Sequence, residues 1–146
     1  MVHINTIGFT RKPARKFFEL LRESGANKLI DVRLNNQSQL AGFAKRDDLE
    51  FFTRELCGMD YLHRTDLAPD QALRTAYRKE NCGWDEYQNR YLDLLHDRNI
   101  ADTLSPELVD NAVLLCSEDQ PHHCHRRLLA EYLADNWDDV TINHLS

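Results

Sequence analysis

The 146-residue sequence has no uninterrupted apolar run long enough to cross a membrane or to serve as a secretory signal. It contains no C-x-x-C pair, and its four cysteines are too few and too scattered for a disulfide-rich secreted domain. We therefore expect a cytoplasmic protein that has no membrane partner and keeps its thiols reduced.

Positive charge is also scarce, because 18 Lys and Arg residues are outnumbered by 24 Asp and Glu residues and the net charge is −6. Broad binding of duplex nucleic acid needs many contacts from Lys and Arg to phosphates. The charge balance therefore disfavours nucleic acid as a partner, although a local basic pocket stays compatible with it. The length and the absence of repeats or linkers predict one domain over residues 1–146.

Short apolar runs alternate with stretches of helical periodicity along the whole chain. The runs predict strands at His3–Ile7, Lys28–Arg33, Met59–His63, Val113–Leu115 and Val140–Leu145, the last at a sheet edge. Apolar residues at helical spacing fall within 14–21, 49–56, 70–79, 84–95 and 128–133. Thr10 is the expected N-cap of the first helix, and Gly25 and Gly58 are the expected C-terminal stops of the first two. This pattern predicts the α/β class: a single mostly parallel sheet of about five strands with helices on both faces, a three-layer sandwich.

One stretch, residues 112–133, concentrates chemically active side chains between an expected strand and an expected helix. The apolar run Val113–Leu115 ends abruptly at Cys116, and Pro121 suits the first turn of the next helix. Ligands of open parallel sheets bind beyond the carboxyl ends of strands, beside helix N-termini that favour anions. The sequence therefore predicts the functional site at this junction.

A helical wheel ranks the side chains at the start of that last helix. His125 lies on the apolar arc that residues 128–132 define, and Arg126 lies at its edge. Arg127 falls on the opposite side and is expected to be a solvated charge near Glu131. The alternative for His125 is a core histidine bonded to a backbone carbonyl.

Two other strand ends should meet this junction in a parallel sheet. One carries Gly8 to Thr10, and the other carries Asp31 and Arg33, which point to the same face because side chains alternate along a strand. The alternative for Asp31 and Arg33 is a purely structural ion pair.

These groups together would form a pocket of mixed charge. Two arginines could clamp an anion, a carboxylate could act as general acid or base, and a cysteine could act as nucleophile if a histidine or the helix N-terminus lowers its pKa. The alternative for Cys116 is a small buried residue at a strand end. The predicted substrate-binding residues are Gly8, Thr10, Asp31, Arg33 and Arg126, and the predicted catalytic residues are Glu118, His125, Cys116 and Cys124.

The strings TIGFT, LIDVR, AGFAK, LLCSE and CHRRLLAEYL resemble, through nearly the whole chain, the family catalogued as domain of unknown function 488. That family has two signatures, a Gly-His-Ser near the start and a Cys-His-Arg near the end. Cys124-His125-Arg126 matches the second, whereas Gly8-Phe9-Thr10 replaces the first, so no role of the missing histidine carries over. The resemblance implies an α/β fold and a shared site, and it brings no activity with it.

Several functions from different classes fit these residues. The first is an enzyme acting on a small anionic or phosphate-bearing substrate, with nucleotides and nucleic-acid fragments included. The second is sulfurtransferase-like thiol chemistry, although no glycine-rich cysteine loop is present. The third is metal binding by Cys116, Cys124 and the nearby histidines, whose types suit zinc but whose spacing matches no familiar pattern, so that no metal ligand is assigned. A non-catalytic interaction module is the last, and the sequence assigns neither a cofactor nor an oligomeric state.

Overall fold

The computed structural model describes residues 1–35, 42–80, 82–117 and 124–146. Within them the elements are β1 (Val2–Gly8), α1 (Ala14–Ser24), β2 (Lys28–Asp31), the 3-10 helix η1 (Gly42–Ala44), α2 (Arg46–Cys57), β3 (Asp60–His63), the 3-10 helix η2 (Thr65–Leu67), α3 (Gln71–Arg78), α4 (Trp84–Asp97), α5 (Ile100–Thr103), α6 (Pro106–Val109), β4 (Ala112–Cys116), α7 (His125–Asn136) and β5 (Val140–His144). A strand or helix is present at each predicted place, although β2 ends at Asp31 and not at Arg33 as predicted. Between α4 and β4 the chain also forms the short helices α5 and α6, which the sequence pattern did not predict.

The five strands form one all-parallel sheet in the order β3-β2-β4-β1-β5. The predicted α/β class and the edge position of the last strand are therefore confirmed. The register aligns Gly8 with Cys116 and Asp31 with Leu115. The carboxyl ends of β2, β4 and β1 thus lie side by side at the middle of the sheet.

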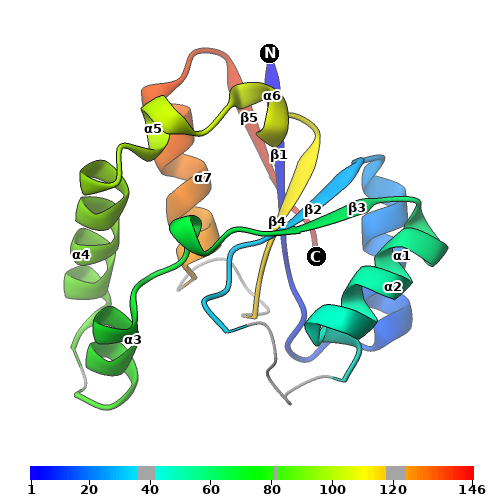
Figure 1. Cartoon of the computed structure of the whole chain (residues 1–146), viewed down its shortest axis with the longest axis horizontal. Helices are drawn as coiled ribbons and strands as arrows, with labels where there is room; N and C mark the ends of the chain where they lie inside the picture. The colour runs from blue at the N-terminus through cyan, green and yellow to red at the C-terminus, as the bar shows by residue number, and fades with distance from the viewer. Residues whose placement is uncertain (36–41, 81, 118–123) are drawn as a thin grey trace.

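Helices cover both faces of this sheet, as Figure 1 shows. Helices α1 and α2 pack on one face, where Phe17, Leu21 and Leu49 are fully buried. Helices α3 to α7 pack on the other face, where Tyr91 and Leu129 are fully buried. We call these the α1 face and the α7 face. Because strand residues alternate, neighbouring side chains of one strand belong to different faces.

The C-terminal ends of α1 and α2 lie where the sequence predicts them, whereas the N-terminal end of α1 does not. Gly25 and Gly58 both take the left-handed conformation that ends α1 and α2, as predicted. The prediction of Thr10 as N-cap was wrong, because Arg11 has φ 64° and turns the chain, and α1 begins only after Pro13. The predicted role of Pro121 lies outside the described residues, in which α7 begins at His125 with Cys124 as its N-cap.

None of the described helices combines the length and the apolar character that a membrane span requires.

Candidate functional site

The first predicted site residues sit where β1 and β4 end together. Gly8 is buried and paired with Cys116, the last residue of β4. The backbone N–H of Thr10 donates to the carbonyl of Ser117 at 2.9 Å. This bond ties the segment after β1 to the segment after β4, so both predicted loops start from one edge of the sheet.

A cluster of sulfur and guanidinium groups fills the α7 face at this edge. Cys116 and Cys124 are 1% and 2% exposed, and the structure joins them in a disulfide. The fully buried Arg126 places Nη1 at 3.5 Å from the sulfur of Cys116 and 3.7 Å from that of Cys124, and its Nε donates to the hydroxyl of Thr6 at 3.3 Å. Together with His125, we call these residues the sulfur–arginine cluster. The expectation of reduced thiols is not met at this pair, whereas Cys57 and Cys82 are free.

His125 faces the cluster from the first turn of α7. Its Nε2 lies 2.8 Å from the carbonyl of Val32, and its ring packs edge-on against Tyr91 with the ring centres 5.5 Å apart. A carbonyl only accepts, so Nε2 carries the proton and donates. Burial, with a smaller contribution from nearby Arg126, lowers the pKa of His125 to about 4 against the opposing effect of the Val32 hydrogen bond. The imidazole is therefore neutral at physiological pH, and its Nδ1 has a lone pair.

Arg126 lies in an unusual electrostatic position. Helix N-termini carry partial positive charge and favour acidic neighbours. The first turn of α7 has no acidic residue and instead holds Arg126 and Arg127. Arg127 is partly exposed and reaches Glu131 at 3.8 Å, as the helical wheel predicts. Arg126 is fully buried, so its charge and the positive end of α7 act together on the two sulfur atoms.

A second polar group, which we call the aspartate cluster, lies on the α1 face of the same edge. The Asp31 carboxylate accepts from Arg33 Nε at 2.8 Å, from Arg33 Nη2 at 2.7 Å and from the hydroxyl of Tyr61. Arg33 Nη2 also donates to the carbonyl of Ala44, and the guanidinium carbon lies 5.2 Å from the ring centre of Phe9. The Asp31–Arg33 pair is thus buried and bidentate, which matches the ion-pair alternative for these residues. One guanidinium atom, Arg33 Nη1, is buried and has no hydrogen-bond acceptor among the described residues.

The sheet separates these two clusters. Asp31 pairs with Leu115, whereas Cys116 is the next residue along β4 and its side chain turns to the opposite face. The structure therefore brings together Thr6, Cys116, Cys124, His125 and Arg126 on one face, and it places Asp31 and Arg33 on the other. Predicted Glu118 lies outside the described residues.

The two clusters meet at the backbone that follows β2. His125 on the α7 face bonds the carbonyl of Val32, and His63 on the α1 face bonds the carbonyl of Arg33 through Nε2 at 2.7 Å. Two imidazoles thus hold successive carbonyls of one segment from opposite sides of the sheet.

Sequence reasoning missed Thr6, Tyr61 and His63. Strand alternation would have found Tyr61 and His63 only with the register of β2 on β3, because they pair with Leu29 and Asp31. Thr6 is two residues before the end of β1 and shares the face of Cys116. Its hydroxyl inside a buried run was the available signal.

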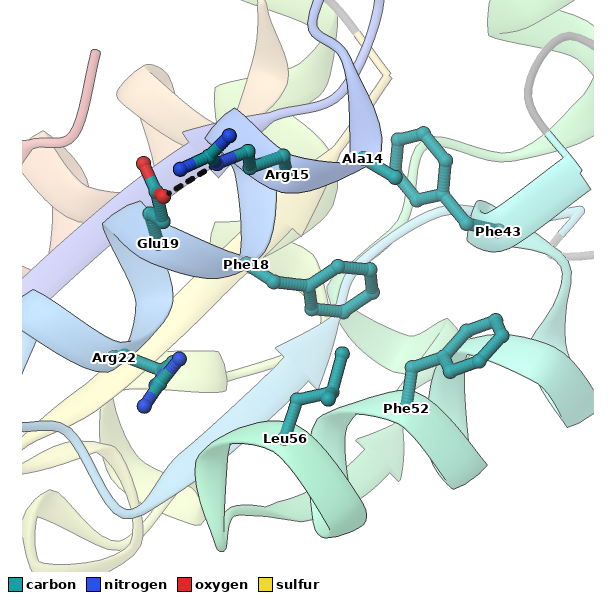
Figure 2. Close-up of a pocket in the computed structure, with 8 residues that line it drawn as sticks. All are labelled: Ala14, Arg15, Phe18, Glu19, Arg22, Phe43, Phe52 and Leu56. Atoms are coloured by element: carbon teal, nitrogen blue, oxygen red, sulfur yellow. Dashed lines mark hydrogen bonds and ion pairs between the residues drawn. The ribbon is translucent and has the colours of Figure 1, made fainter.

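A separate hollow of about 450 Å³ opens between α1 and α2. Figure 2 shows its apolar side chains, Phe18, Phe43, Phe52 and Leu56, with Arg15 hydrogen-bonded to Glu19 on the α1 side. It contains none of the predicted site residues. The chemically active groups are therefore not in this hollow.

A comparison with protein families places most of the chain in one of them. The model described as domain of unknown function DUF488 matches residues 13–133. The matched span includes both clusters except Thr6 and Phe9. Neither the curated proteins nor the solved structures gave a match to the chain.

Proposed function

Since the chain belongs to the DUF488 family, whose description assigns no reaction, we propose from its side chains that it is an enzyme acting on a small anionic substrate at the sulfur–arginine cluster. The observation that supports this proposal is the fully buried guanidinium of Arg126 against the sulfurs of Cys116 and Cys124.

A buried cation at the positive end of a helix is costly unless an anion accompanies it. Thiolates provide that anion within the protein, and a guanidinium at 3.5 Å favours the thiolate over the thiol. A phosphate or carboxylate group that enters the cluster would gain the same stabilisation. The chemistry of the cluster therefore fits an anionic substrate better than a neutral or cationic one.

Each member of the cluster has a role in this proposal. Arg126 binds the anion, the sulfur of Cys116 or Cys124 is the nucleophile, and the Nδ1 of neutral His125 accepts a proton. Asp31 and Arg33 position the backbone from the other face, because their polar groups are largely satisfied by each other.

Substitution of two neighbouring arginines tests the proposal. Inorganic phosphate binding to reduced protein is measured by calorimetry for the wild type, Arg126→Gln and the matched control Arg127→Gln. We expect Arg126→Gln to lose binding by at least about tenfold, the value of one charge-assisted contact, and Arg127→Gln to bind as the wild type does.

Far-ultraviolet circular dichroism establishes that both variants are folded. Equal phosphate binding by Arg126→Gln and wild type would contradict the proposal. If Arg126→Gln is unfolded, Cys116→Ser is used in its place. Turnover of phosphate esters by Cys116→Ser at the wild-type rate would then contradict the proposal.

Thiol redox chemistry is a second candidate, favoured by the disulfide between Cys116 and Cys124. In that reaction the dithiol would give two electrons and two protons to a small external disulfide, which leaves as two thiols. Equilibration in glutathione buffers of graded potential, followed by mass spectrometry, tests it. A pair that stays fully oxidised or fully reduced across all physiological buffers would exclude this candidate.

A further inference from the structure

Three potential metal ligands meet in the sulfur–arginine cluster. The sulfurs of Cys116 and Cys124 and one ring nitrogen of His125 all lie within 4.8 Å of one another. A tetrahedral zinc ion, with bonds of about 2.3 Å to sulfur and 2.0 Å to nitrogen, holds such atoms roughly 3.5–3.8 Å apart. The three atoms therefore lie close enough together for one ion to be shared among them once the disulfide is reduced.

His125 is oriented as metal-binding histidines are. Its Nε2–H donates a hydrogen bond to the carbonyl of Val32, so Nδ1 has the lone pair that could bind a metal ion. Histidines that bind metal almost always give their other ring N–H to a carbonyl or carboxylate, which fixes the ring and its tautomer. The Val32 bond supplies that support from a neighbouring strand.

The backbone around the two cysteines also suits a shared ion. Their Cα atoms are 7.5 Å apart, which is beyond the range of about 4.4–6.8 Å common among disulfides. Thiolate and imidazole ligands together select zinc among the abundant divalent ions. The ion would occupy the sulfurs only after a thiol or phosphine reductant has supplied two electrons to the disulfide, and its binding releases the thiol protons.

We propose that reduced Cys116 and Cys124, with His125, bind one zinc ion, for which the described residues supply no fourth ligand. Two thiolates neutralise the ion, and Arg126 at 3.5 Å and 3.7 Å from the sulfurs adds one positive charge beside it. An external ligand at the fourth position of the ion would therefore be favoured if it were an anion. This last step rests on the anion binding by Arg126 in the proposed function and makes a zinc-bound anion the substrate. In the zinc-bound form the two sulfurs and Nδ1 of His125 hold the ion and do not act as nucleophile and proton acceptor, whereas the metal site itself stands without the proposed function.

Cobalt and zinc titrations test the site. The full chain is purified without a polyhistidine tag, reduced with a phosphine, stripped with a chelator and titrated with cobalt. We expect one equivalent to bind with thiolate-to-cobalt charge-transfer and tetrahedral absorption bands, and zinc to abolish both. Cys116→Ser, Cys124→Ser and His125→Asn should each weaken binding by more than the roughly 10–100-fold typical of outer-shell changes. The matched controls, Cys57→Ser and Cys82→Ser, alter the free cysteines and should bind as the wild type does.

A measurement on unsubstituted protein keeps the inference testable if the variants unfold. Bound zinc should protect Cys116 and Cys124 from alkylation and leave Cys57 and Cys82 as reactive as in the metal-free protein. Cobalt that gives no thiolate band, or binding that Cys57→Ser reduces as much as Cys116→Ser does, would overturn the zinc site. If the zinc site is overturned but metal-free protein binds phosphate, the proposed function is unaffected. If zinc binds but phosphate does not, the metal site is supported and the proposed function is refuted.

Discussion

Asp31→Asn tests how the aspartate cluster stabilises the fold. The carboxylate accepts two side-chain hydrogen bonds from Arg33 and one from Tyr61, and both members of the ion pair are buried. Asparagine keeps the size but removes the charge, so the guanidinium is left buried without its counter-ion. Loss of one partner of a buried ion pair costs about 3–5 kcal/mol, and we expect a decrease of that size in the free energy of unfolding. Urea unfolding followed by circular dichroism at pH 7 and fixed reductant measures it.

The matched control is Asp66→Asn, which breaks the partly exposed pair between Asp66 and Arg64. Solvent screens such pairs, so its cost should be below about 1 kcal/mol. If Asp31→Asn costs no more than Asp66→Asn, the aspartate cluster does not stabilise the fold as argued. If Asp31→Asn also abolished phosphate binding at unchanged stability, Asp31 would belong to the binding site.

Three further substitutions test other parts of the structure by the same urea assay. Leu129→Ala leaves a cavity at a fully buried position of α7 and should lower the free energy of unfolding by about 2–5 kcal/mol. A decrease of less than about 1 kcal/mol would contradict close packing on the α7 face. Gly25→Ala adds a Cβ at φ 71°, and no described atom lies within 4 Å of it. Backbone strain alone should therefore lower the free energy of unfolding by about 1–2 kcal/mol. The control Gly42→Ala lies outside the left-handed region and should lower it by less than about 0.5 kcal/mol. The hydrogen bond from Arg64 lowers the pKa of Asp66. The stabilisation is therefore present above the pKa of the unfolded carboxyl group and is lost as the pH falls through the folded pKa. The free energy of unfolding of Asp66→Asn should equal that of the wild type near pH 2.

The fold could be predicted because its signals are local. The apolar spacing of Phe17 and Leu21 defines the buried side of α1, and both are fully buried. Gly25 and Gly58 end their helices because only a left-handed residue there lets the chain turn back. The start of α1 could not be predicted, because Arg11 takes a left-handed turn and Thr10 bonds the carbonyl of Ser117, which is distant in sequence.

The site could be predicted only in part, because it depends on register. Alternation correctly placed Asp31 and Arg33 on one side of their strand, and they bind each other. Whether that side is also the side of Cys116 depends on how β2 aligns with β4, and no spacing in the sequence encodes that alignment. The wheel placed Arg126 only at the edge of the apolar arc; its complete burial also needs the pairing of Thr6 beside β4.

The histidines that bond the Val32 and Arg33 carbonyls connect the two faces of the sheet through the segment that follows β2. If the ring of His125 tilts, the Val32 peptide must tilt with it, and the neighbouring peptide carries the guanidinium that Asp31 holds. We therefore expect a movement of His125 to shift the backbone beside the aspartate cluster. The effects of substituting His63 and His125 on the free energy of unfolding should therefore be non-additive, although the two rings lie on opposite faces of the sheet.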